Sequence, residues 1–212
     1  GAERVFDLLD EPEEVDNGYV TLVNAVEQPD GTLTESPVRT GVWAWKHPHH
    51  DGTLTYTPLK GEIEFCNVDF GYDSRKVLDN VSFAIPEKTS TAIVGPSGSG
   101  KTTITRLIAR FWDIQDGSIT VGGHDVKEIT CDSLLKNMSM VFQNVYLFRD
   151  TIENNIKFGF PEATHEQVVE AAKKACCHDF ITALPDGYNT VIGEGGSTLS
   201  GGEKQRISIA RA

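Results

Sequence analysis

The sequence predicts an α/β fold preceded by a small β-rich appendage, and three observations support this prediction. A glycine-rich loop over residues 95–102 lies between a short apolar run and a stretch of helical periodicity. Strand and helix patterns alternate after residue 61, as they do in α/β cores. Before that residue, short alternating runs separated by turn residues indicate hairpins.

Composition excludes some classes of function. The 212 residues with 39% hydrophobic content suffice for a sizeable core. A formal net charge of −12 argues against a nucleic-acid partner, because proteins that bind the phosphate backbone need clustered Lys and Arg. No apolar run in the sequence approaches the ~20 residues that span a bilayer. The four cysteines lack C-x-x-C spacing, which indicates a reducing compartment and favours packing over redox chemistry at Cys176-Cys177.

The chain begins with a short helical pattern. Val5, Leu8 and Leu9 share one helical face, and Pro12 ends it. Residues 1–15 therefore look like the end of a longer element.

Residues 16–60 are predicted to form a β appendage of two hairpins. The expected strands cover residues 19–23, 32–34, 42–45 and 53–56. Trp43 and Trp45 share one strand face, which favours packing on a core over docking on a neighbour. Three turn histidines, His47, His49 and His50, are expected to be solvated rather than to hold a metal, because they lack a fixed fourth ligand.

Beyond residue 60, strand and helix patterns follow one another. The expected strands include Ile63 with Phe65, Val81 to Ile85, Thr91 to Val94, Ile119 to Val121 and Met138 to Phe142. Tyr72 lies in a turn between the first two of these strands. Residues 144–198 are expected to be helical, with a capping box at Thr164 and Gln167.

Residues 95–102, Gly-Pro-Ser-Gly-Ser-Gly-Lys-Thr, fit G-x-x-x-x-G-K-[ST], the loop whose backbone N–H groups wrap a nucleotide's phosphates. The helix that follows points its positive N-terminal end at the anion. We expect Lys101 to neutralise β- and γ-phosphate oxygens and Thr102 to ligate Mg2+. The predicted phosphate-binding residues are Gly95, Ser97, Gly98, Ser99, Gly100, Lys101, Thr102 and Thr103.

A second helix N-terminus follows at Leu199-Ser200-Gly201-Gly202-Glu203. Ser200 is a good N-cap, and the two glycines leave the tip of the helix open to an anion. On this stretch alone, an ordinary capped helix is the preferred interpretation.

Together with the phosphate loop, this stretch resembles the signature of the ATP-binding cassette (ABC) transporters. The similarity covers residues 61–212 well and residues 3–14 loosely. It implies an α/β P-loop NTPase-type cassette with an antiparallel β subdomain and a helical subdomain at about 144–200, plus the β-hairpin insertion at 16–60. Glu203 stands where the usual signature has Gln, a substitution common among exporters.

The resemblance also implies roles for single residues. Tyr72 matches the aromatic residue that stacks on adenine, and Gln143 matches the glutamine that meets Mg2+ and the attacking water. Ser200, Gly201, Gly202 and Glu203 would serve ATP held by the opposite cassette, so the partner is a second cassette in a homo- or heterodimer.

Two further stretches are similar to exporters rather than importers. Residues 143–156 resemble the segment that faces the coupling helices of a membrane domain, and residues 190–196 resemble the loop before the signature. The resemblance implies that the cassette lies at the cytoplasmic face of the plasma membrane. Residues 1–15 would be the linker that follows the membrane domain. The insertion at 16–60 contains none of the matched motifs, so we expect nucleotide binding without it.

The resemblance places a Mg-binding Asp, the catalytic Glu and the switch His beyond Ala212. We therefore expect an incomplete cassette that is hydrolytically inactive alone, in a parent protein that continues in both directions. Two alternatives remain at this point: an ABC ATPase without membrane helices, and a degenerate cassette that binds ATP as a regulatory ligand.

Overall fold

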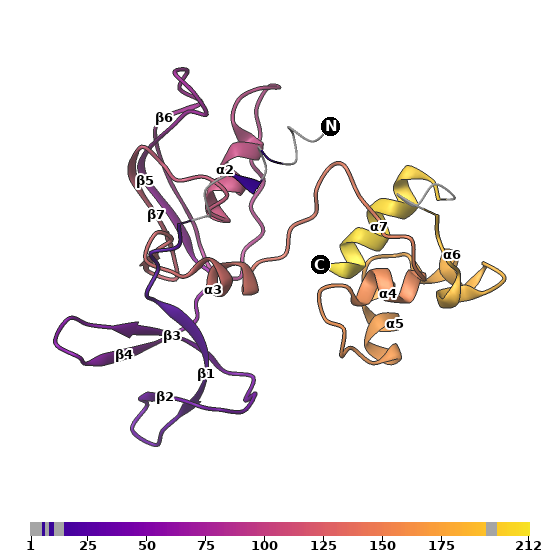
Figure 1. Ribbon diagram of the computed structural model, residues 1–212, viewed down its shortest axis with the longest axis horizontal. Coiled ribbons are helices and arrows are strands. Elements are labelled where there is room, and N and C mark those ends of the chain that lie inside the picture. Colours follow the sequence, from indigo (N-terminus) through magenta and orange to yellow (C-terminus); the bar gives the residue numbers. More distant parts are fainter. Residues whose placement is uncertain (1–5, 7–8, 11–14, 194–198) are drawn as a thin grey trace. The chain divides into compact units, whose positions relative to one another are not determined.

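The computed structural model describes residues 6, 9–10, 15–193 and 199–212 (Figure 1). The chain divides into two compact units, residues 1–138 and 139–212, and each unit is described by itself. Most of the helix expected at 1–15 lies outside the described residues, as do residues 194–196 of the loop expected before the signature.

The appendage forms one antiparallel sheet. Its strands are β1 (Thr21–Glu27), β2 (Leu33–Glu35), β3 (Trp43–Pro48) and β4 (Leu54–Pro58), in the order β2-β1-β3-β4. Both predicted hairpins are present, and β1 also pairs with β3, so that Leu22 lies opposite Trp45. Asp30 and Asp51 close the two hairpin turns, each accepting hydrogen bonds from the amide and hydroxyl of the Thr two residues later.

A second antiparallel sheet follows. Its strands are β5 (Ile63–Phe70), β6 (Leu78–Ile85), β7 (Asp116–Val121) and β8 (His124–Asp125), in the order β6-β5-β7-β8. This unit also contains the helices α2 (Lys101–Ile108) and α3 (Cys131–Lys136). Leu107 of α2 is buried with Phe70 and Ile119, so the α2 helix packs on the same core as this sheet.

The appendage and the second sheet share one hydrophobic core. Val20 and Trp45 are fully buried in the same cluster as Phe65, Val121 and Ile129. The predicted core position of Trp45 is therefore confirmed, whereas Trp43 is only half-buried.

Backbone contacts fasten the appendage to the segment before α3. The Tyr19 and Val20 amides each donate to the Glu128 carbonyl oxygen at 2.8 Å, and the Thr130 amide donates to Val20 O at 3.0 Å. Gly18 allows this approach, because a Cβ there would lie 2.5 Å from the carbonyl carbon of Ile129. Asp16 accepts the Cys131 amide at 2.8 Å, at the first turn of α3.

Two predicted strands do not form. Residues 91–94 and 138–142 contain no strand residues, and neither run pairs with another strand among the described residues. A strand forms only where its backbone hydrogen-bonds to a neighbouring strand. The strand propensity of these residues is therefore not sufficient by itself to form one. Val94 is accordingly 87% exposed.

The second unit is helical, as the sequence predicts for residues 144–198. Its helices are α4 (Ile152–Lys157), α5 (His165–Lys174), α6 (His178–Thr182), the 3-10 helix η1 (Gly187–Asn189) and α7 (Gly201–Arg211). The capping box at Thr164 and Gln167 is confirmed, with both reciprocal hydrogen bonds present. Ile152, Ile181 and Ile207 are fully buried in the core that joins these helices.

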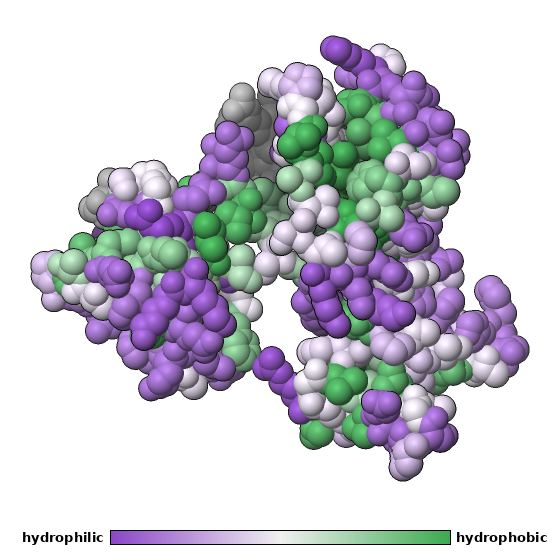
Figure 2. Space-filling model, turned by 180° about the vertical axis from the view of Figure 1, so that it is seen from behind, coloured by the Kyte–Doolittle hydropathy of each residue, from purple (hydrophilic) through white to green (hydrophobic). Residues whose placement is uncertain are grey.

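Hydrophobic side chains also remain on the surface among the hydrophilic ones (Figure 2). In the part of the chain that the structure describes, no helix has the length and apolar composition needed to cross a bilayer.

Candidate nucleotide-binding site

The glycine-rich loop leads directly into α2, as predicted. Gly98 and Gly100 adopt φ values of 79° and 83°, a left-handed conformation that glycine accepts without strain. A Cβ on Gly100 would lie 2.9 Å from Leu78 Cδ2, and one on Gly95 would lie 2.7 Å from Ser99 Oγ. The loop therefore keeps its shape because its glycines lack side chains.

Lys101 is the first residue of α2, and its side chain folds back over the loop. Its Nζ donates to the carbonyl oxygens of Gly95 at 2.9 Å and Pro96 at 2.6 Å, and lies 3.4 Å from Ser99 Oγ. The first turn of α2 contains no acidic residue. A cation and a helix N-terminus thus meet at one exposed loop, which is an arrangement that attracts anions.

Tyr72 lies beside this helix although 31 residues separate it from Thr103. Its hydroxyl is 3.2 Å from Thr103 Oγ1, and its ring meets those of Phe70 and Trp112 edge to face. The Tyr72 side chain is anchored at its hydroxyl end and remains 41% exposed. An exposed aromatic ring beside a phosphate-type loop is suited to stacking on a base.

The loop residues fit a magnesium nucleotide in their chemistry. Thr102 is exposed in the first turn of α2, where its hydroxyl oxygen is a suitable ligand for Mg2+. Lys101 supplies the positive charge, and the exposed loop leaves room for phosphate oxygens. Tyr72, Lys101, Thr102 and Thr103 thus lie within one unit and around one helix end.

The other predicted site residues belong to the second unit. Gln143 is exposed in the segment before α4. Ser200 caps α7 in a complete capping box, in which Glu203 Oε2 accepts from the Ser200 amide at 2.7 Å and from its hydroxyl at 2.8 Å. These hydrogen bonds lower the pKa of Glu203, so its charge persists at the helix N-terminus.

Gly201 and Gly202 lie exposed in the first turn of α7. Among the residues that the structure describes, no atom lies within 4 Å of a Cβ built on Gly201, so packing against those residues does not explain this glycine. A close external approach to the backbone would explain it.

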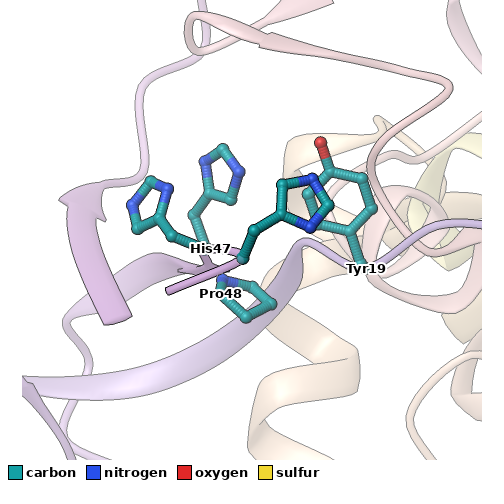
Figure 3. Close-up of a pocket in the computed structure, with 5 residues that line it drawn as sticks. Tyr19, His47 and Pro48 are labelled. Carbon is teal, nitrogen blue, oxygen red and sulfur yellow. The ribbon is translucent and has the colours of Figure 1, made fainter. Parts of the chain in front are cut away.

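The histidine turn lines a pocket of about 420 Å³ in the first unit, formed by Tyr19, His47, Pro48, His49 and His50 (Figure 3). The rings of His47 and His49 stack with their centroids 4.6 Å apart. Among the described residues, no group of three or more His, Cys, Asp or Glu side chains is arranged to hold a metal ion.

Sequence reasoning missed one partly buried polar network in the second unit. Arg211 donates to the Asn155 carbonyl oxygen at 2.9 Å and to its side-chain oxygen at 3.1 Å. The two residues lie 56 positions apart, and neither belongs to a short motif with a mechanism of its own.

The family model described as ABC transporter matches residues 78–212. An uncharacterised ABC transporter ATP-binding protein of Bacillus subtilis is 44% identical over 213 residues, covering 100% of this chain and 30% of the relative. An ATP-dependent lipid A-core flippase of Desulfotalea psychrophila is 50% identical over 155 residues, covering 73% of this chain and 27% of that protein.

A solved structure is also similar: a bacterial Atm1-family ABC exporter with ATP bound. It matches with a TM-score of 0.70 and 47% sequence identity, over 72% of this chain and 27% of that one. The chain therefore spans less than a third of the length of these relatives.

Proposed function

We propose, from the premise that this chain belongs to the ABC transporter family, that it binds MgATP for an exporter and hydrolyses it as part of the full transporter. The chain is an ATP-binding domain of the exporter type. Its relatives include a protein named as a lipid A-core flippase and a structure titled as an Atm1-family exporter. These names favour an exporter over an ABC ATPase without membrane helices.

The observation that best supports this proposal is the convergence of Tyr72, Lys101 and Thr103. A cation folded over a glycine loop, a helix N-terminus and an anchored aromatic ring are the parts needed for a triphosphate and a base. In our proposal Gly95, Ser97, Gly98, Ser99 and Gly100 surround the phosphates. Thr102 and Gln143 ligate Mg2+, and Gln143 also orients the attacking water.

The signature tip would act on a second cassette. We propose that Ser200, Gly201, Gly202 and Glu203 contact ATP bound to the opposite cassette, which is supported by the space that the described residues leave open beside Gly201. Hydrolysis then requires a dimer, with either two identical or two different cassettes.

The second partner would be the membrane domain of the same transporter. Exposed aromatic side chains lie in and just after segment 143–156. Tyr146 is 55% exposed and Phe158 is 58% exposed. Exposed aromatic rings gathered in one place are typical of protein contacts. We propose that they face this membrane domain on the cytoplasmic face of the plasma membrane.

Calorimetric titration of the purified chain with MgATP tests the proposal. We expect saturable 1:1 binding that Lys101→Ala weakens at least about tenfold, because a phosphate cluster then lacks its nearest cation. Lys127→Ala, which removes an exposed lysine elsewhere in the same unit, is the matched control and should leave the Kd unchanged. Equal affinity of the wild type and Lys101→Ala would contradict the assignment of the loop.

A further inference from the structure

Helix α7 connects two different surfaces of the second unit. Its N-terminus presents Gly201 and Gly202, and its last residue is Arg211. At 1.5 Å per residue, a helix of this length separates its two ends by roughly 15 Å.

The guanidinium of Arg211 holds the segment around α4 by three hydrogen bonds. Its Nε donates to Asn155 O at 2.9 Å, one Nη to the Asn155 side-chain oxygen at 3.1 Å and the other to Tyr146 O at 3.2 Å. Its Cζ also lies 5.7 Å from the ring centroids of both Phe148 and Phe158.

Asn155 continues this network. It is 1% exposed, accepts the Phe148 amide at 2.8 Å and donates to the carbonyl oxygens of Phe148 and Thr151 at 3.0 Å. The conformation of residues 146–151 is thus fixed by two side chains, one of which belongs to α7.

The chemistry of this contact requires arginine. Burial lowers the pKa of Arg211, and no carboxylate lies within ion-pair distance of it in the described part of the chain. Its charge is compensated by neutral oxygens and ring faces, which suits a planar, weakly hydrated guanidinium with several fixed donors. The three bonds come from three separate guanidinium nitrogens, whereas an ammonium group has all its donors on one atom.

The residues that Arg211 holds form an aromatic patch, which we define as Tyr146, Phe148 and Phe158. The rings of Phe148 and Phe158 stack at 4.5 Å, and Tyr146 meets Phe148 edge to face at 5.5 Å. All three side chains are exposed. Arg211 therefore lies beneath an exposed surface and at the end of the helix whose other end carries the signature.

We propose that Arg211 is a positioning residue that fixes the aromatic patch to helix α7, so that movement of the signature tip on nucleotide binding reaches the patch. This rests on the proposed function, in which the tip contacts ATP and the patch contacts the membrane domain. Arg211 itself touches neither partner in this scheme. It acts through Asn155 and the two phenylalanine rings.

Hydrogen–deuterium exchange in the full-length transporter tests this coupling. Exchange is measured at residues 199–206 and 146–158, with and without Mg2+ and a non-hydrolysable ATP analogue. In the wild type, we expect the analogue to slow exchange in both segments. In Arg211→Lys, the response at 199–206 persists, while the response at 146–158 falls to less than about a third of its wild-type size.

The matched control is Arg206→Lys. Arg206 lies on the same helix with its Cζ 5.4 Å from the Phe180 ring, outside the aromatic patch. It should retain both responses. A merely structural role for Arg211 would raise exchange equally with and without the analogue and leave the difference intact, and this result would overturn the proposal.

The nucleotide-free samples separate this proposal from the proposed function. There, Arg211→Lys should speed exchange of the Phe148 amide at least about tenfold relative to Arg206→Lys, and unchanged exchange would overturn the positioning role. Absence of any wild-type response at 199–206 would instead contradict the proposed contact of the signature with ATP. If Arg211→Lys does not fold, Phe148→Leu replaces it, and a full response at 146–158 in that variant would overturn the proposal.

Discussion

The Tyr72 hydroxyl lies 3.2 Å from Thr103 Oγ1, so a turn residue of the second sheet is anchored to the helix that follows the glycine loop. This contact fixes one end of the ring and leaves its exposed part beside the loop. A base stacked on Tyr72 and phosphates held at Lys101 would then occupy one continuous surface.

Tyr72→Ala should weaken MgATP binding at least about fivefold, because base–aromatic stacking contributes ~1–3 kcal/mol. Tyr72→Phe is the matched control, since it keeps the ring and removes only the hydroxyl contact with Thr103. We expect its Kd to stay within about threefold of the wild-type value. Fluorescence titration with a nucleotide analogue measures both variants, and wild-type affinity in Tyr72→Ala would exclude the stacking role.

Trp45→Ala should lower the free energy of unfolding of the first unit by about 3–5 kcal/mol, because it leaves a large cavity in a shared core. Trp43→Ala on the same strand serves as the control, and its partly exposed side chain should cost clearly less. Urea denaturation followed by circular dichroism gives both values. Similar losses in the two variants would contradict the special role of the buried Trp45 side chain in this core.

His124 should make stability depend on pH. Burial lowers its pKa, the charge of His47 acts in the same direction, and Glu128 opposes both. Its Nε2 lies 2.8 Å from Thr57 Oγ1 and its ring meets His47 edge to face. Because the folded state releases this proton more readily, the unfolded state binds more protons once the pH falls below about 6.5.

The contribution of neutral His124 to stability should therefore be fully present above about pH 6.5 and should decline as the pH falls through that value. His124→Gln should flatten this dependence, whereas His50→Gln at an exposed turn position should preserve it. Urea midpoints at about pH 7.5 and pH 5.5 provide the measurement. An equally steep decline in His124→Gln would assign the effect to other groups.

Cys177 should resist alkylation although it neighbours an exposed cysteine. Burial raises its pKa to about 11, and its thiol donates to the Ala172 carbonyl oxygen at 3.4 Å. Only the thiolate reacts, so at pH 8 about one Cys177 in a thousand is reactive. Iodoacetamide followed by mass spectrometry should label Cys66 and Cys176 first, and rapid labelling of Cys177 would revive a redox role for the pair.

The elements that the sequence predicted well are those governed by local chemistry. The glycine loop, the hairpin turns closed by Asp30 and Asp51, and the caps at Thr164 and Ser200 each depend on residues within a few positions. Such interactions are readable from spacing alone. The same reasoning placed Tyr72 correctly in a turn but could not show its contact with Thr103.

The failures concern partners that are distant in the sequence. The strands expected at 91–94 and 138–142 had suitable residues but no neighbouring strand. The network of Arg211 with Asn155 joins positions far apart in the sequence, and a partly buried arginine among neutral oxygens has no sequence pattern of its own. The shared core of Trp45 with Val121 likewise follows from packing between two sheets.

The contact between Asp16 and the Cys131 amide has a consequence for synthesis on the ribosome. It closes a chain segment of 115 residues, whereas the two hairpins inside that segment require only neighbouring strands. Local hairpins can therefore form as they emerge, but their docking must wait until α3 has been translated. At 5–20 residues per second, the indole of Trp45 stays without its final partners for several seconds in every newly made molecule, a period in which chaperones could bind it.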